Sequence, residues 1–338
     1  MSTLDVFIFK HHIEKGVKTK FQVAIAELPD GTPINIPVMV ARGQRSGPTL
    51  CLSGAIHGDE YNGVAVISRL LKQLDPGELA GTVIGVPVMN PFAYYAEARL
   101  NKFDYELQNL NRIFPGNPDG DLGQRMANKA FEGIFAHADF IIDYHEGGRD
   151  FMAKYMLVGG DIDKSSDVSQ QAHQMARWFG HGVPVAVTYR TEVERRPGYS
   201  GTLTGAAGAR GIPAIGVELG GAGRVWEEFV SLGIAGTRNI MIGLGMLDGQ
   251  MVETDREQVF CHVHSWPRPT HAGLLIPMPD SDRLGAIVEE GQVLALIYDP
   301  FGEVVEEIRA PYRAVLLDTR HSAIVYPGDW TYHCGRVP

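Results

Sequence analysis

Three residues that favour metal binding lie at two widely separated points of the chain. His57 and Glu60 occur within Ser53 to Gly63, and His145 directly follows the apolar run Phe140 to Tyr144. Neutral imidazoles and a carboxylate are suitable ligands for Zn²⁺. Catalytic zinc sites often combine a short ligand pair with a distant third ligand and leave the fourth position for water. We therefore predict one zinc ion per chain, bound by His57, Glu60 and His145.

Both parts of this metal site have simpler alternatives. A His-x-x-Glu motif also arises where a surface histidine precedes an acidic helix start, because the helix dipole favours Asp59 and Glu60 there. His145 could be a core histidine that bonds to the backbone. Gly147 and Gly148 favour the metal site, because they would let the backbone turn closely around it.

Glu218 is a candidate general base. It ends the apolar run Ala214 to Glu218, and a buried carboxylate is costly unless it is paired. Near a metal ion, it could accept a proton from the attacking water and return it to the leaving amine. Glu146 competes for this role, but in a regular strand it would point away from the face that His145 uses. We therefore prefer Glu218.

The loop Asn109 to Gly116 contains residues suited to an anionic substrate group. Arg112 could bind a carboxylate through two parallel hydrogen bonds, and Asn111 could add another. Arg99 could polarise the scissile carbonyl, although a solvated surface arginine explains it equally well. The arginine-rich stretch 190–199 could form a specificity loop or an ordinary surface loop.

The elements that must position these residues form an α/β pattern. Apolar runs bounded by Gly, Pro or Asn predict buried strands at 49–53, 82–89, 140–144 and 214–218. Apolar residues at helical spacing predict helices at 61–74, 122–137 and 167–179. This alternation predicts a mixed sheet with a largely parallel centre, flanked by helices, with edge strands near 6–10 and 22–27. Such sheets bind ligands at the carboxyl ends of their strands.

The pattern changes near residue 255. Residues 261–272 contain prolines and three histidines and are expected to form a linker. Short strands separated by turns then follow at 286–288, 293–298, 304–308, 314–317 and 323–326. We predict a catalytic domain at 1–260 and a small all-β domain at 261–338.

Composition limits the classes of partner. The formal net charge is −10 and no run of basic residues occurs, which argues against a nucleic-acid partner. No apolar stretch approaches the length of a membrane span, and Met1 to His12 lacks the pattern of a signal peptide. Three scattered cysteines do not indicate a disulfide framework. We expect a cytoplasmic protein that acts on a small molecule.

Together these motifs resemble the succinylglutamate desuccinylase/aspartoacylase family, which is similar to the zinc carboxypeptidases. The family's His-x-x-Glu matches His57 and Glu60, and its later strand-end histidine matches His145. Its Asn-Arg-x-Phe-Pro-Gly matches 111–116, and its catalytic glutamate matches Glu218. The resemblance implies a carboxypeptidase-like fold, a zinc ion, and hydrolysis of the amide bond of a small N-acylated amino acid or related amine.

Two departures from the family pattern bear on the substrate. The family commonly has Asp-Leu-Asn-Arg where this chain has Asn109 to Arg112, a form closer to deacetylases of N-acetyl-diaminobutyrate-like compounds. Glu146 stands where small or hydroxyl residues are frequent. Two other functions stay open: a metallocarboxypeptidase that acts on peptides, and a non-catalytic binding protein that retains the metal site.

The C-terminal part also resembles a known fold. Residues 287–295 are similar to the barrel-sandwich fold of biotinyl and lipoyl carriers. Such carriers need a lysine, and none follows Lys164, so a covalently attached biotin or lipoate is excluded. We expect this part to wall the cleft or to mediate assembly, for example of a homo-oligomer.

Overall fold

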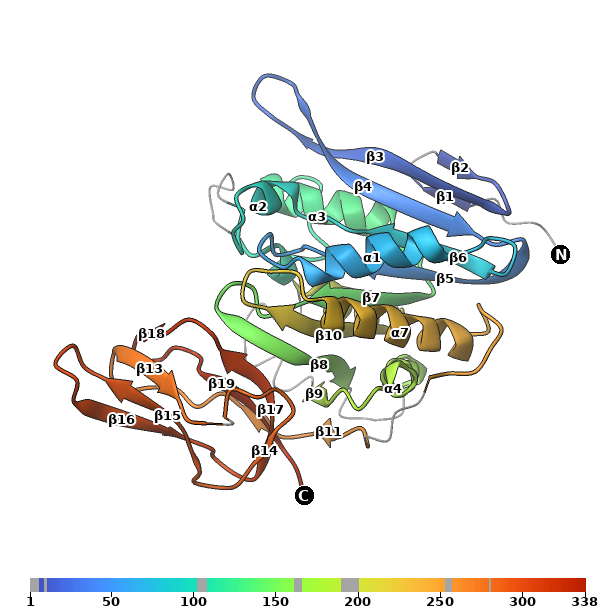
Figure 1. Cartoon of the computed structure of the whole chain (residues 1–338). Coiled ribbons are helices and arrows are strands. Elements are labelled where there is room, and N and C mark those ends of the chain that lie inside the picture. Colours follow the sequence, from blue (N-terminus) through green and yellow to red (C-terminus); the bar gives the residue numbers. More distant parts are fainter. Residues whose placement is uncertain are drawn as a thin grey trace.

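The computed structural model describes residues 6–8, 11–101, 108–160, 166–189, 201–252, 257–279 and 281–338 (Figure 1). In the first half of the chain the elements are β1 Val6–Ile8, β2 His11–Ile13, β3 Val17–Glu27, β4 Pro33–Arg42, β5 Arg45–Ser53, α1 Asn62–Gln73, β6 Ala80–Val86, α2 Pro91–Tyr95, η1 Leu110–Arg112, α3 Leu122–Gly133, η2 Phe135–His137, β7 Phe140–His145 and β8 Phe151–Gly160. In the second half they are α4 Asp167–Phe179, β9 Val185–Tyr189, α6 Leu203–Ala209, β10 Ala214–Gly221, α7 Glu227–Gly243, β11 Phe260–Cys261, β12 His264–Ser265, β13 Gly273–Pro277, β14 Ile287–Val288, β15 Val293–Tyr298, β16 Val304–Arg309, β17 Ala314–Arg320, β18 Ile324–Val325 and β19 Tyr332–Arg336.

Most of the described strands join one mixed sheet. Its central order is β8-β10-β7-β5-β6, in which β10, β7, β5 and β6 run parallel and β8 is antiparallel to β10. Antiparallel strands β4 and β3 extend one side, and β17, β19 and β12 extend the other. The prediction of a mixed sheet with a parallel centre is confirmed.

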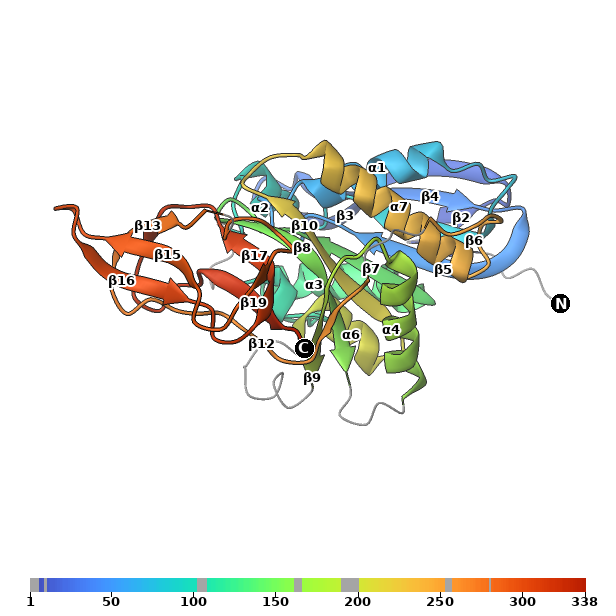
Figure 2. The same ribbon diagram turned by 60° about the horizontal axis from the view of Figure 1, so that its bottom comes forward.

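Alternate residues of the central strands enter two separate apolar cores. Leu50 and Leu52 of β5 pack with residues of α1, α4 and α7, whereas Cys51 packs with residues of α3 and α6 on the other face. Strands covered on both faces need apolar residues at nearly every position, which explains the continuous apolar runs. Figure 2 shows α1 and α7 side by side along the first face.

Several elements differ from the sequence-based prediction. The helix expected at 122–137 ends at Gly133 and is followed by the 3₁₀ turn η2. The sequence patterns do not predict β4, β8, β9, α6, α7 or β19. The segment expected as a linker contributes β11 and β12, which pair with β9 and β19. Among the described residues, the structure contains no helix long and apolar enough to cross a membrane.

The C-terminal residues form a small antiparallel sheet of order β16-β15-β13-β18. Its core, which includes Leu275, Ile297 and Tyr332, is built from residues that follow position 261. The predicted C-terminal all-β part is therefore present. It is also joined to the large sheet, because β17 pairs with β8. The exact division at 260/261 stays a prediction.

Candidate metal centre and active site

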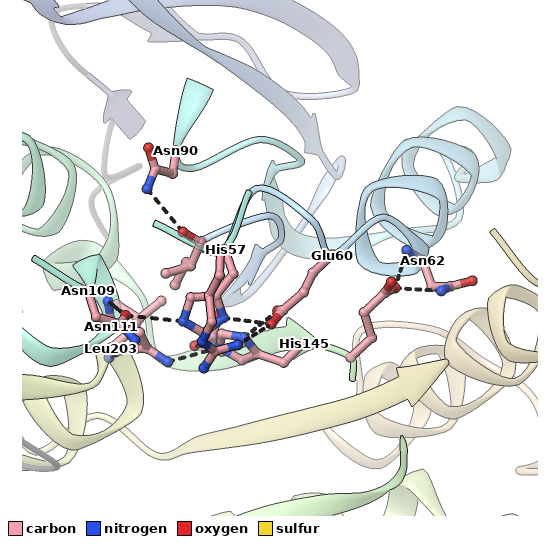
Figure 3. Close-up of polar contacts among 12 residues, drawn as sticks. His57, Glu60, Asn62, Asn90, Asn109, Asn111, His145 and Leu203 are labelled. Atoms are coloured by element: carbon pink, nitrogen blue, oxygen red, sulfur yellow. Dashed lines mark hydrogen bonds and ion pairs between the residues drawn. The ribbon is translucent and has the colours of Figure 1, made fainter. Parts of the chain in front are cut away.

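The turn after β5 places the pair His57–Glu60 at the carboxyl end of a central strand. Asn90 donates a hydrogen bond from Nδ2 to the Ile56 carbonyl at 3.2 Å, which fixes the start of the turn (Figure 3). Gly58 is required here, because a Cβ atom at this position would lie 1.9 Å from the carbonyl carbon of Ala93. The turn then leads directly into α1.

The structure brings His57, Glu60 and His145 together. Their ligand atoms all lie within 4.8 Å of one another, and the three side chains are buried. Nδ1 of His57 is 2.6 Å from Oε1 of Glu60, and Nδ1 of His145 is 2.7 Å from Oε2 of the same carboxylate (Figure 3). Two imidazoles and a carboxylate therefore form a cluster that could hold a metal ion.

The other ring nitrogen of each histidine is also bonded. Nε2 of His57 is 3.1 Å from Oδ1 of Asn109, and Nε2 of His145 is 3.0 Å from Oδ2 of Asp143. A neutral ring that donates from Nε2 to an oxygen keeps the Nδ1 lone pair for a metal ion. The donor set and its surroundings thus fit a bound zinc ion.

Charges in the cluster favour an added cation. Burial lowers the pKa of His57 to about 4, so this ring is neutral at neutral pH. Burial opposes ionisation of Glu60, but the two neighbouring histidines outweigh it and hold the Glu60 pKa below its usual value. Burial also opposes protonation of His145, yet the Asp143 and Glu60 carboxylates raise the His145 pKa well above its usual value. Either a proton or a metal ion supplies the positive charge that these carboxylates favour.

Glu218 lies beside the cluster on the neighbouring strand. It is opposite His145 in the parallel pairing of β10 and β7, so the two side chains share one face of the sheet. Burial raises the pKa of Glu218 to about 8; the positive charge of His145 opposes this shift and the Glu60 carboxylate adds to it. A carboxyl group with this pKa can both lose and regain a proton near neutral pH.

Glu146 bonds to the start of α1 instead. Its Oε2 accepts hydrogen bonds from the backbone N of Asn62, at 2.7 Å, and from the Asn62 side chain. Asn62 is the first residue of α1, so the carboxylate satisfies a free N–H at the helix N-terminus. Burial raises the pKa of Glu146 to about 8. These contacts give Glu146 a structural partner and favour Glu218 as the base.

The predicted substrate residues lie close to the cluster but make contacts within the protein. Nδ2 of Asn111 is 3.0 Å from Nε2 of His145, and Oδ1 of Asn111 accepts a hydrogen bond from the Leu203 backbone at 2.9 Å (Figure 3). Arg112, the next residue, donates to the Asn111 carbonyl at 2.7 Å. Asn111 thus links the loop to a ligand of the cluster.

Arg99 also reaches the cluster. Its guanidinium lies 3.1 Å from Oε1 of Glu60, and its side chain is about half exposed, at 45%. Arg99 is thus both partly exposed to solvent and paired with Glu60. The stretch 190–199, considered as a specificity loop, lies outside the described residues.

Sequence reasoning missed Asp143 and gave no role to Asn109, although both contact a histidine of the cluster. Asp143 lies two residues before His145 on β7, and this spacing puts both side chains on one face of the strand. That two-residue spacing is the signal that could have identified Asp143.

Comparison with known proteins gives a consistent set of relatives. Residues 46–244 match the succinylglutamate desuccinylase/aspartoacylase catalytic domain. The chain is 31% identical over 320 residues to the N-alpha-acetyl-L-2,4-diaminobutyric acid deacetylase of Halomonas elongata, an alignment that covers 88% of this chain and 84% of that protein. A crystal structure of a succinylglutamate desuccinylase from a Silicibacter species is 26% identical, with a TM-score of 0.79 over 93% of each chain. A succinylglutamate desuccinylase/aspartoacylase structure from Rhodobacter sphaeroides is 25% identical, with a TM-score of 0.80 over 95% of this chain and 96% of that one.

Proposed function

This chain belongs to the succinylglutamate desuccinylase/aspartoacylase family, and from that membership we propose that it is a zinc-dependent deacylase. The reaction is hydrolysis of the amide bond of a small N-acylated amino acid or related amine. The Halomonas elongata relative is named for a compound of this class. The observation that carries the proposal is the buried cluster of His57, Glu60 and His145, with Glu218 opposite His145 on the adjacent strand.

His57, Glu60 and His145 would hold one zinc ion per chain. When bound, zinc supplies Lewis acidity that polarises a water molecule and the scissile carbonyl. Asn109 and Asp143, which bond to the Nε2 atoms, would hold the two rings with their Nδ1 atoms available as ligands.

Glu218 would move the protons of the reaction. It would accept a proton from the attacking water and then donate it to the departing amine. Its raised pKa suits both steps, because the group must lose and regain a proton at nearly the same pH. Arg99, which lies beside Glu60, would stabilise the negative charge that develops on the carbonyl oxygen.

Arg112 and Asn111 would position the substrate. A guanidinium binds a carboxylate with two parallel hydrogen bonds, so Arg112 would hold the carboxylate of the amino acid and fix the scissile carbonyl beside the cluster. Asn111 would assist it and also contacts His145, which ties substrate position to ligand position.

We also propose that the protein acts in the cytoplasm. We further propose that residues 1–260 form the catalytic domain and residues 261–338 form a β domain.

A substrate panel tests the proposed reaction. Zinc-loaded protein should release free amine from Nα-acetyl-2,4-diaminobutyrate, N-acetylaspartate or N-succinylglutamate, and a chelator should abolish the release. A short peptide with a free carboxyl terminus serves as the comparison substrate. Hydrolysis of the peptide alone would identify a metallocarboxypeptidase. Zinc binding without turnover of any of these compounds would identify a binding protein.

A further inference from the structure

A carboxylate from the C-terminal part of the chain lies on the same face of the sheet as the proposed active site. In the pairing of β17 with β8, Asp318 is opposite Ala153. Tyr155, two residues further along β8, is opposite Glu218 of β10. Side chains opposite one another, or two residues apart on a strand, share a face. Asp318 therefore shares its face with Glu218 and lies two strands away from it. Figure 1 shows β8 between β10 and β17.

Among the described residues, the Asp318 carboxylate forms no ion pair with a positively charged side chain. Its Oδ1 atom is buried and accepts no hydrogen bond from any of them. Burial raises the pKa of Asp318 well above its usual value, and the Glu218 carboxylate raises it further, whereas Arg99 lowers it. Arg99 is already paired with Glu60. The side chain accepts a hydrogen bond from the backbone N–H of Thr319, but this neutral donor does not compensate a buried negative charge, so the position favours an incoming cation.

Aromatic rings line the strands on both sides of Asp318. The ring of Tyr155 on β8 meets the ring of His333 on β19 edge to face, with centroids 4.9 Å apart. His333 is opposite Asp318 in the pairing of β17 and β19, and its ring stacks on Trp266 at 3.9 Å. A carboxylate next to aromatic rings is suited to an alkylammonium group, which bonds to the carboxylate and contacts the rings through cation–π attraction.

We propose that Asp318 is a specificity-determining residue that binds a free ammonium group on the substrate, so that this enzyme favours N-acylated amino acids with a cationic side chain. Two inter-strand spacings, roughly 10 Å, separate the backbones of β10 and β17. A substrate that reaches both carboxyl groups would need a short carbon chain between the scissile amide and the ammonium group. The inference rests on the proposed deacylase function and adds the chemical class of its substrate.

A matched pair of substrates tests this role. Nα-acetyl-2,4-diaminobutyrate carries the ammonium group, and Nα-acetyl-2-aminobutyrate has the same backbone without it. Zinc-loaded wild type should have the higher kcat/KM for the cationic compound. Asp318→Asn, which removes the charge and keeps the shape, should lower that kcat/KM by about ten- to a hundredfold, mainly through KM, as expected for a hydrogen bond to a charged group. For the neutral compound, kcat/KM should change by less than about threefold, because this compound has no ammonium group for Asp318 to bind.

Three controls separate specificity from folding and from loss of the reaction itself. Asp282→Asn removes an exposed carboxylate from the same part of the chain and should leave both kcat/KM values unchanged. Asp318→Glu should retain part of the preference for the cationic compound. Calorimetric binding of the products 2,4-diaminobutyrate and 2-aminobutyrate should show the same preference, again lost in Asp318→Asn.

Equal losses for both substrates in Asp318→Asn, or no loss for the cationic one, would overturn the inference while leaving the deacylase function in place. If wild type hydrolyses neither compound but does hydrolyse N-acetylaspartate or N-succinylglutamate, the inference about Asp318 is overturned and the deacylase function stands. If wild type hydrolyses none of these compounds, the proposed function fails, and the product-binding preference still decides whether Asp318 binds an ammonium group.

Discussion

Each histidine of the cluster uses both of its ring nitrogens. Nδ1 points toward Glu60, and Nε2 bonds to Asn109 in His57 or to Asp143 in His145. The outer partner fixes the ring orientation and the tautomer, and a carboxylate in this place also makes the ring a better ligand. Asp143 should therefore affect metal binding although it lies outside the ligand set.

Replacing Asp143 with Asn should lower zinc affinity about ten- to a hundredfold, the usual effect of removing such an outer partner. Competition with a chromogenic chelator measures this affinity. Asp150→Asn, which changes an exposed aspartate in the loop after β7, is the matched control and should bind zinc like wild type. Unchanged affinity in Asp143→Asn would mean that the Asp143 carboxylate is not needed to orient the His145 ring.

The general base can be separated from metal binding by Glu218→Gln. The amide cannot accept or return the proton, so kcat should fall by about 10²–10⁴-fold while zinc content persists. KM should change less, because Glu218 is proposed to act mainly in the transition state. Glu146→Gln, the matched change on the competing carboxylate, should keep most of the turnover. The opposite pattern would make Glu146 the base.

The residues of the His57, Glu60 and His145 cluster were predictable from the sequence, whereas the side chains that bond to them were not. His and Glu at the ends of apolar strands are unusual enough to be noticed. Asp143 lies inside a buried strand, where its role depends on which way the His145 ring is turned. Asp318 lies far along the chain from the other site residues, and only the pairing of β17 with β8 brings it near Glu218.

At the scale of elements, a contact between Glu146 and Asn62 joins the end of β7 to the start of α1. His145 directly precedes Glu146, and the His57–Glu60 turn directly precedes α1. One contact therefore joins the two segments that contribute residues to the cluster.

Burial of Glu146 should make stability depend on pH in metal-free protein, although its hydrogen bonds to Asn62 oppose the effect. Burial raises the Glu146 pKa from 4.5 to about 8, so between these values the folded state keeps a proton that the unfolded state has lost. Stability due to Glu146 should then fall with rising pH, by up to about 1.4 kcal/mol per pH unit. Glu146→Gln lacks this effect, so urea unfolding from pH 5 to 8 should show the variant gaining stability relative to wild type. Parallel profiles would contradict the raised pKa.

Helix α7 is an element that the sequence patterns did not predict, and its glycines explain why. Its glycines weaken the helical signal, since glycine has a low helix propensity. They are needed for close packing: a Cβ atom would lie 2.7 Å from a side-chain atom of Val66 at Gly233, and 2.5 Å from one of Phe179 at Gly236. The strands β5, β7 and β10 were predictable because burial on both faces makes them continuously apolar.

At the scale of the whole molecule, the C-terminal part shares structure with the rest. β17 pairs with β8, and an apolar cluster joins Ala153 and Tyr155 to Val315 and Leu317. We therefore expect one cooperative unfolding transition in calorimetry. Two well-separated transitions would show that residues 261–338 unfold independently.

The central claim is that one zinc ion at His57, Glu60 and His145 is needed for amide hydrolysis. Zinc titrated into metal-free protein, with Nα-acetyl-2,4-diaminobutyrate as substrate, tests it most directly. We predict that activity rises linearly to one equivalent of zinc per chain and then stays constant, and that His145→Ala shows neither the activity nor the tight binding. Full turnover by the metal-free protein, or by His145→Ala, would contradict the account.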